Sequence, residues 1–115
     1  MKITKIISDE KGESHFAEVE IPLIDQGEIG FLSDSICVKK LQFRKVSAEY
    51  NYDFHCAPQK QYIVLLQGGV EIETSLGEIR QFQTGEILLV EDISGKGHKT
   101  KNLEKKERTS LFIHI

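Results

Sequence analysis

Four histidines are the side chains in this sequence that can exchange a proton near neutral pH: His15, His55, His98 and His114. His15 and His114 lie in strand-like patterns near the ends of the chain, a setting in which a histidine is usually structural. His55 and His98 differ, because each adjoins turn signals and a buried-strand pattern. A rigid scaffold can hold such a side chain over a cavity, so these two histidines are the predicted centre of any chemistry.

Gln61 is expected to join the two histidines. A straight strand would separate it from His55 by about 20 Å, but Pro58 lies between them, and proline fits poorly inside a central strand. A turn over residues 57–60 therefore folds Gln61 back beside His55. Because His98 comes from a later segment, two imidazoles and one amide are predicted to converge inside one barrel.

Short segments with strand character must position these side chains. Residues 15–23 and 70–74 alternate apolar and polar side chains, the period of two that marks a strand with one face in the core. Residues 62–66 and 87–90 are apolar on both parities, which predicts central strands buried on both sides, and residues 111–115 predict a closing strand. No long helical stripe is present, and a single helical turn fits between Asp25 and Ser35. Glycine-marked turns between short strands predict an all-β sandwich or barrel.

Composition limits the classes of function. The 115 residues fit one domain, and the net charge of −3 argues against a nucleic-acid partner, since binding phosphates requires a basic field. No apolar run approaches the ~20 residues that cross a bilayer, so no membrane partner is expected. A charged N-terminus without a signal-peptide pattern and two cysteines without CxxC spacing predict free thiols in a cytoplasmic protein. The lysine-rich stretch over residues 96–108 is interpreted as a solvated loop and strand edge.

The order of these features resembles the cupins, which are double-stranded β-helix or jelly-roll barrels, over roughly residues 36–115. The first cupin block has the pattern G-x5-H-x-H-x3,4-E-x6-G, and His55 takes its first histidine position, with the closing glycine also in place. The second block has the pattern G-x5-P-x-G-x2-H-x3-N. Residues 77–85 match its glycines, and His98 with Asn102 keeps the H-x3-N spacing after a longer gap.

The departures from the pattern concern the metal site that the resemblance implies. Metal-binding cupins typically place three histidines and one glutamate around one ion, whereas here Ala57 stands at the second histidine position and Gln61 at the glutamate position. An amide is a weak ligand and carries no negative charge. The expected cofactor is therefore either none or one divalent ion of iron, zinc, nickel or manganese, held by His55, His98 and Gln61.

Such a reduced metal site needs a supplement from Asp53, Cys56 or water. Asp53 is two residues before His55, so both side chains can share one strand face and, with His98, imitate the two-histidine, one-carboxylate triad of iron oxygenases. Alternatively, Asp53 begins a turn or faces solvent. Cys56 points away from His55 in a regular strand, and only a bulge or a register shift brings it inward.

Without a metal, the resemblance implies acid–base chemistry, as in cupins that epimerise or isomerise sugars with a histidine as proton acceptor. The catalytic candidates are then His55, His98 and Gln61. The candidates for ligand binding are Tyr52, Tyr62, Gln59 and Asn102.

Three kinds of function stay open. The first is a small-molecule enzyme, either an isomerase, epimerase or lyase without a metal or an oxygenase-type enzyme with a reduced ligand set. The second is a non-catalytic module that binds or senses a small molecule, and the third is a structural domain with a filled barrel. Residues 1–35 are expected to add N-terminal strands that pack on the barrel or on a partner subunit, and residues 36–115 to form the cupin barrel. The resemblance implies a homodimer.

Overall fold

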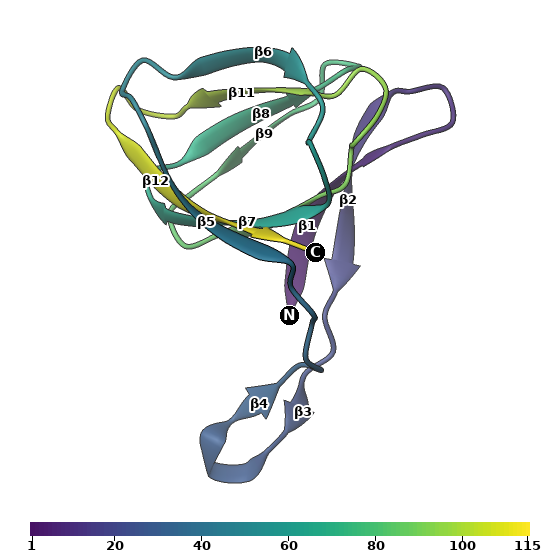
Figure 1. Cartoon of the computed structure of the whole chain (residues 1–115), viewed down its shortest axis with the longest axis vertical. Helices are drawn as coiled ribbons and strands as arrows, with labels where there is room; N and C mark the ends of the chain where they lie inside the picture. Colours follow the sequence, from purple (N-terminus) through teal and green to yellow (C-terminus); the bar gives the residue numbers. More distant parts are fainter.

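The computed structural model describes all 115 residues as two facing β-sheets and a separate pair of short strands (Figure 1). The larger sheet has the strand order β2-β1-β10-β7-β12-β5, and the smaller sheet has the order β6-β11-β8-β9. The strands are β1 (Lys2–Ser8), β2 (Ser14–Glu20), β3 (Ile24–Asp25), β4 (Phe31–Leu32), β5 (Lys40–Val46), β6 (Asn51–His55), β7 (Gln61–Gln67), β8 (Val70–Thr74), β9 (Ile79–Phe82), β10 (Ile87–Val90), β11 (His98–Asn102) and β12 (Arg108–His114). This architecture confirms the predicted all-β class. No helix here has the length and apolar character that spanning a membrane would require.

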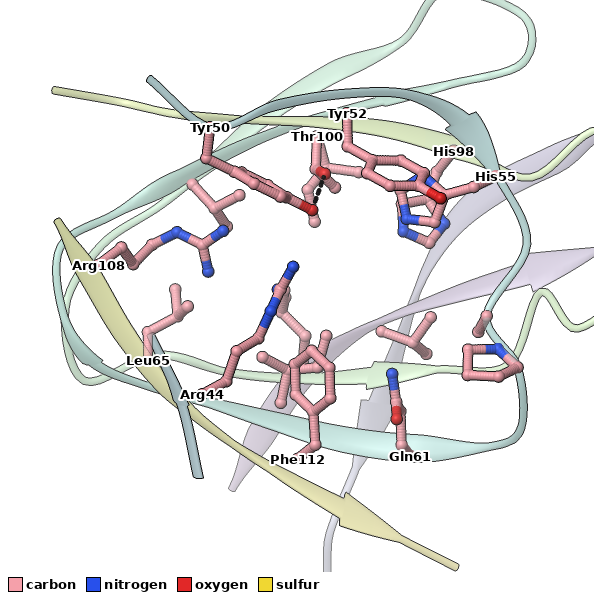
Figure 2. A pocket seen from close by; sticks show the side chains of 17 residues that line it. Arg44, Tyr50, Tyr52, His55, Gln61, Leu65, His98, Thr100, Arg108 and Phe112 are labelled. Carbon is pink, nitrogen blue, oxygen red and sulfur yellow. Dashed lines mark hydrogen bonds between the residues drawn. The ribbon is translucent and has the colours of Figure 1, made fainter. Parts of the chain in front are cut away.

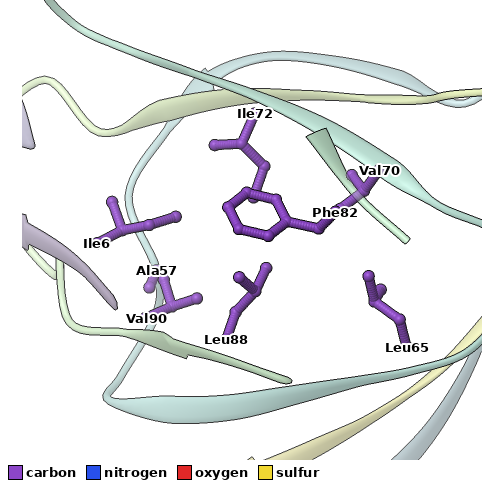
Figure 3. Packing of buried hydrophobic residues seen from close by; sticks show 8 residues of the cluster. All are labelled: Ile6, Ala57, Leu65, Val70, Ile72, Phe82, Leu88 and Val90. Carbon is purple, nitrogen blue, oxygen red and sulfur yellow. The ribbon is translucent and has the colours of Figure 1, made fainter. Parts of the chain in front are cut away.

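The interior between the sheets is built by the period-two alternation of the strands. On β7, Leu65 is 1% exposed, and on β10 Leu88 and Val90 are each 1% exposed. Figure 3 shows the cluster that these side chains form with their neighbours. Its members are Ile6, Ala57, Leu65, Val70, Ile72, Phe82, Leu88 and Val90. Most of these residues also line a cavity between the two sheets, so the hydrophobic core forms part of the cavity wall.

Of the two strands predicted to be buried on both sides, β10 is buried on both faces from Leu88 to Val90, whereas β7 is fully buried on one face only. β7 and β10 are central in the larger sheet, as expected. On β10 the outward-facing Leu89 is 8% exposed, but on β7 Val64 is half-buried and Leu66 is 47% exposed. The reason is that no further layer of this chain packs against the outer face of the sheet.

Residues 1–35 divide into two parts. β1 lies parallel to β10 and antiparallel to β2, so the first two strands extend the larger sheet of the barrel. β3 and β4 pair only with each other, and the 3-10 turn η1 (Gly27–Ile29) lies between them. This hairpin, residues 24–32, stands away from the barrel (Figure 1) and is called the arm. It contains the single helical turn expected in this region.

The segment 91–97 connects β10 to β11 and ties three parts of the barrel together. The Asp92 carbonyl oxygen accepts a hydrogen bond from the Ala57 backbone N–H at 3.1 Å, and the Gly97 carbonyl accepts one from the Ser14 hydroxyl at 2.7 Å. Gly97 has φ of 71°, and a Cβ at this position would overlap the carbonyl group of His55. Glycine at this position therefore allows β11 to begin directly beside His55.

We expect Gly97→Ala to destabilise the protein more than Gly85→Ala does. Both glycines have positive φ, so each alanine costs about 1–2 kcal/mol of backbone strain. A Cβ on Gly85 meets no atom within 4 Å, whereas one on Gly97 forces a backbone shift that costs about 1–3 kcal/mol more. Urea unfolding measures the difference, and equal losses of stability in the two variants would contradict the close approach.

Candidate functional site

A cavity of about 180 Å³ lies between the two sheets (Figure 2). Its polar lining residues are Arg44, Tyr50, Tyr52, His55, Gln61, His98, Thr100 and Arg108. Apolar side chains of β7, β8, β10 and β12 form most of the remaining wall. A small apolar chamber with a few converging polar groups is the usual form of a small-molecule site.

His55 and His98 lie next to each other in the cavity wall. They are direct partners in the antiparallel pairing of β6 with β11, and their ring centroids are 4.6 Å apart. Side chains of directly opposed residues point to the same face of a sheet, so both rings project into the cavity (Figure 2). The structure thus brings together the two histidines that the sequence singled out.

His98 is held by a buried carboxylate that the sequence did not reveal. Its Nδ1 lies 2.6 Å from Oδ2 of Asp92, and the two residues are 4% and 0% exposed. Because a carboxylate only accepts, Nδ1 carries the proton, and in the neutral ring Nε2 is left with a lone pair. A histidine oriented in this way by a buried carboxylate can act as a general base.

His55 is held by the backbone of its own strand. Its Nδ1 donates to the Asp53 carbonyl oxygen at 2.8 Å, and the Tyr52 ring meets it edge-on with centroids 4.1 Å apart. Burial lowers the pKa of His55 below its ordinary value near 6.5, and the neighbouring His98 acts in the same direction. His55 is therefore held in its neutral form at pH 7.

Gln61 faces the histidines from the larger sheet (Figure 2), since β7 lies opposite β6 across the interior. Its side chain is buried, and its Oε1 has no hydrogen-bond partner in the protein. The turn through Pro58 thus carries the chain from one sheet to the other, and Gln61 lies across the cavity from His55 instead of beside it.

The other predicted ligand-binding residues divide between the cavity and its surroundings. Tyr52 lines the cavity, whereas Tyr62 has the opposite strand parity and does not. Gln59 donates from Nε2 to Nδ1 of His114 at 2.8 Å, outside the cavity lining. Asn102 accepts a hydrogen bond from Nε of Arg108 at 2.9 Å, so it supports a cavity residue without lining the cavity itself.

Asp53 and Cys56 both lie outside the cavity lining. Asp53 is exposed, and its Oδ1 accepts a hydrogen bond from the Phe54 backbone N–H at 2.8 Å. The Cys56 thiol is free and donates to the Gly95 carbonyl at 3.2 Å. Neither side chain therefore supplements the two histidines as a metal ligand in this arrangement.

The donor set does not fit the metal that many cupins hold. Nowhere in the chain do three or more His, Cys, Asp or Glu side chains gather in a way that could hold a metal ion. In the cavity wall His55 and His98 are joined by the neutral amide of Gln61, the Asp92 carboxylate is hydrogen-bonded to Nδ1 of His98, and Ala57, at the second histidine position of the motif, is part of the apolar core. No step of the chemistry proposed below is therefore assigned to a metal.

Sequence reasoning missed Asp92, Arg44 and Arg108. Arg108 is 3% exposed, so the interpretation of residues 96–108 as a solvated stretch is wrong at this position. The available signal was strand parity, because Arg108 alternates with Thr109 and shares its strand face with Ser110 and Phe112. Asp92 closely follows a buried strand, and no signal in the sequence distinguishes it from an ordinary turn residue.

The lowered pKa of His55 makes stability depend on pH. The unfolded state binds a proton below about pH 6.5, whereas folded His55 does so only at lower pH, so stability is lost as pH falls from about 6.5 toward the folded pKa. We expect His55→Gln to remove this part of the loss. Urea unfolding between about pH 7 and pH 5 compares the two proteins. An equally steep decline in both would show that His55 is not the group responsible.

Comparison with known proteins yields likeness in structure only. No family model and no curated protein match the chain. The chain is similar to the Cnp3 cupin domain of Schizosaccharomyces pombe, with 14% identity and a TM-score of 0.51, over 98% of this chain and 82% of that chain. Protein NMB1881 of Neisseria meningitidis matches with 12% identity and a TM-score of 0.47, over 97% of this chain and 81% of that chain. Together with the two facing sheets, the likeness to Cnp3 shows that this chain has the cupin fold.

Proposed function

We propose that the barrel binds a small organic molecule and moves protons on it by acid–base catalysis, as an isomerase, epimerase or lyase does. The observation that carries this proposal is the buried hydrogen bond between Asp92 and His98 in the cavity wall, 2.6 Å long. Burying a carboxylate costs several kcal/mol unless it is well paired. A histidine with only a structural role could be held by an exposed carboxylate at a lower desolvation cost. The burial of this pair therefore supports a functional role.

The two histidines have different tasks in this proposal. Nε2 of His98 removes a proton from a carbon next to a carbonyl group, and the electron pair of the C–H bond moves toward the carbonyl oxygen as an enolate. Asp92 is a positioning residue, because it fixes the ring and stabilises the imidazolium that forms. The imidazolium of His98 returns its proton to the same or a neighbouring carbon, and His55, 4.6 Å away between ring centroids, offers a neutral Nε2 lone pair that can accept a proton from the ligand. Gln61 offers an amide to the oxygen of the ligand.

Hydrogen exchange tests this proposal with any carbonyl compound that binds. Small carbonyl-containing metabolites are screened for a rise in melting temperature, and each hit is incubated with the protein in D2O. We expect proton NMR to show deuterium entering a carbon-bound position. His98→Gln should abolish exchange, and Asp92→Asn should slow it by about 10²-fold or more while leaving binding within a few-fold.

A second His–Asp pair of the chain provides the matched control. Nε2 of His15 lies 2.6 Å from Oδ2 of Asp9, the same separation as in the buried pair, but both side chains are exposed on the outside of the barrel. His15→Gln should therefore leave exchange unchanged. Hits that bind and never exchange would overturn the catalytic proposal and favour the binding or sensing module. No binding by any compound would favour the structural domain.

We also propose that the chain forms a homodimer through the outer face of the larger sheet. Outward-facing residues of neighbouring strands are apolar and lie opposite each other: Leu111 pairs with Phe43, and Ile113 with Leu41. Phe43 is 80% exposed and Leu41 52% exposed. The face continues through Tyr62, Val64, Ile87 and Leu89 on β7 and β10. Contiguous apolar faces of this kind mark protein–protein interfaces.

The arm supplies the argument for a second copy as the partner. Its exposed apolar residues are Ile24, Ile29, Phe31 and Leu32. The arm points away from the barrel of its own chain (Figure 1), so these side chains are not buried within one molecule. In a two-fold dimer, each arm can cover apolar surface of the other copy. This pairing would also account for the apolar outward-facing side chains of residues 62–66, which stay partly exposed within one chain.

We expect the wild type to be a dimer in light scattering and sedimentation, and Leu41→Glu with Phe43→Glu to be a folded monomer. A charge at both positions of the face would remain buried and unpaired in the dimer. Leu76→Glu is the control, because Leu76 is 66% exposed in the turn after β8, away from the larger sheet. A monomeric wild type, or a double variant that stays dimeric, would overturn this assembly.

A further inference from the structure

Two arginines reach into the barrel from neighbouring strands. Arg44 lies on β5 and Arg108 on β12, and both line the cavity (Figure 2). Their guanidinium carbons lie 4.9 Å and 5.2 Å from the centroid of the same Tyr50 ring. Because both guanidinium carbons lie this close to one ring, the distance between them cannot exceed the sum of these two distances. Arg44 is also 4.9 Å from the centroid of the Phe112 ring, so aromatic faces hold its side chain in place.

Neither arginine has a counter-charge. Every other residue lining the cavity is uncharged or a histidine, and no carboxylate is among them. Arg108 donates through Nε to the neutral Asn102, and neither arginine forms an ion pair. Burial lowers the pKa of Arg108, and the positive charge of Arg44 adds to the effect. Buried charges are normally paired, so this site has a surplus of positive charge that a ligand would balance.

The chemistry of the two ends of the cavity defines what would fit. The guanidinium group is a planar fork of donors that matches carboxylate and phosphate oxygens. At the other end, His55 and His98 face the same space (Figure 2). The cavity volume of about 180 Å³ limits the ligand to a small molecule.

We propose that the ligand of this barrel is a small organic oxoanion whose carboxylate or phosphate group is bound by Arg44 and Arg108 while its reactive carbon faces His98. This inference rests on the proposed function, because it names the substrate class of the same site. The guanidinium groups orient the ligand, and their positive charge also stabilises the enolate that forms when a proton leaves.

Paired probes of matched shape test the charge requirement. The anionic probes are acetate, pyruvate, malonate, succinate and inorganic phosphate, and the neutral ones are acetamide, malonamide and succinamide, all at constant sodium chloride. We expect at least one anion to raise the melting temperature saturably and to shift the Arg108 Nε–H resonance, and the amides to do neither. Comparing carboxylates with phosphate identifies which oxoanion the site prefers.

Arg44→Gln carries the mutational test, because Arg44 is only half-buried, whereas replacing the buried Arg108 risks the fold. We expect at least about tenfold weaker anion binding in Arg44→Gln, and an intermediate loss in Arg44→Lys, which keeps the charge without the fork. Arg80→Gln is the matched control: Arg80 also lies 4.9 Å from an aromatic centroid, that of Phe16, but it is outside the cavity and pairs with Glu78. The anion affinity of Arg80→Gln should equal that of the wild type.

The outcomes separate this inference from the proposed function. If no anion shifts the Arg108 resonance, or if Arg44→Gln binds anions as tightly as the wild type, the oxoanion site is wrong. Hydrogen exchange on a carbon of a neutral ligand, if it is lost in His98→Gln, would then leave the acid–base proposal intact. Conversely, anion binding that depends on Arg44 without hydrogen exchange in any bound ligand would support the oxoanion site and overturn the catalytic proposal.

Discussion

The hydrogen bond between the Asp92 carboxylate and the His98 imidazole is the interaction on which the arrangement of the barrel depends. Both side chains lie in the interior, where either would be costly without the other. The backbone of Asp92 also accepts a hydrogen bond from Ala57, at the turn that leads from His55 to Gln61. The short connection between β10 and β11 therefore holds His98 directly and fixes the start of the turn that follows His55.

The unpartnered polar atoms of the interior argue for a cavity that is used. Three buried side-chain oxygens have no hydrogen-bond partner in the protein: Asp92 Oδ1, Gln61 Oε1 and Ser110 Oγ. Of the three residues, only Gln61 lines the cavity, whereas Ser110 is opposite Arg44 in the pairing of β12 with β5. Native proteins leave few such groups unsatisfied. A barrel that served only as a scaffold would gain stability from an apolar residue at position 61, so the unpartnered Gln61 Oε1 in the cavity wall favours a hydrogen-bonding occupant.

Most of the fold could be predicted from the sequence, because strand alternation and glycine turns are local signals. His55, Gln61 and His98 could also be predicted, because they stand at motif positions beside turns. Arg44, Asp92 and Arg108 could not, since their burial depends on how distant strands face each other. Arg108 is the clearest case: the lysines that precede it are largely exposed, and only its parity with Ser110 and Phe112 turns it inward.

The charge of the interior differs in sign from the charge of the whole chain. The net charge of −3 correctly describes a surface rich in acidic groups, but it conceals a cavity whose only full charges are the two guanidinium groups. Burial is the main cause of the lowered pKa of His55, and the positive charge of Arg44 adds a smaller contribution in the same direction. An oxoanion bound at Arg44 would offset that field and raise the proton affinity of His55. The ligand would therefore strengthen a base of the site as it binds, which couples substrate charge to proton transfer through electrostatics alone, without movement of the barrel.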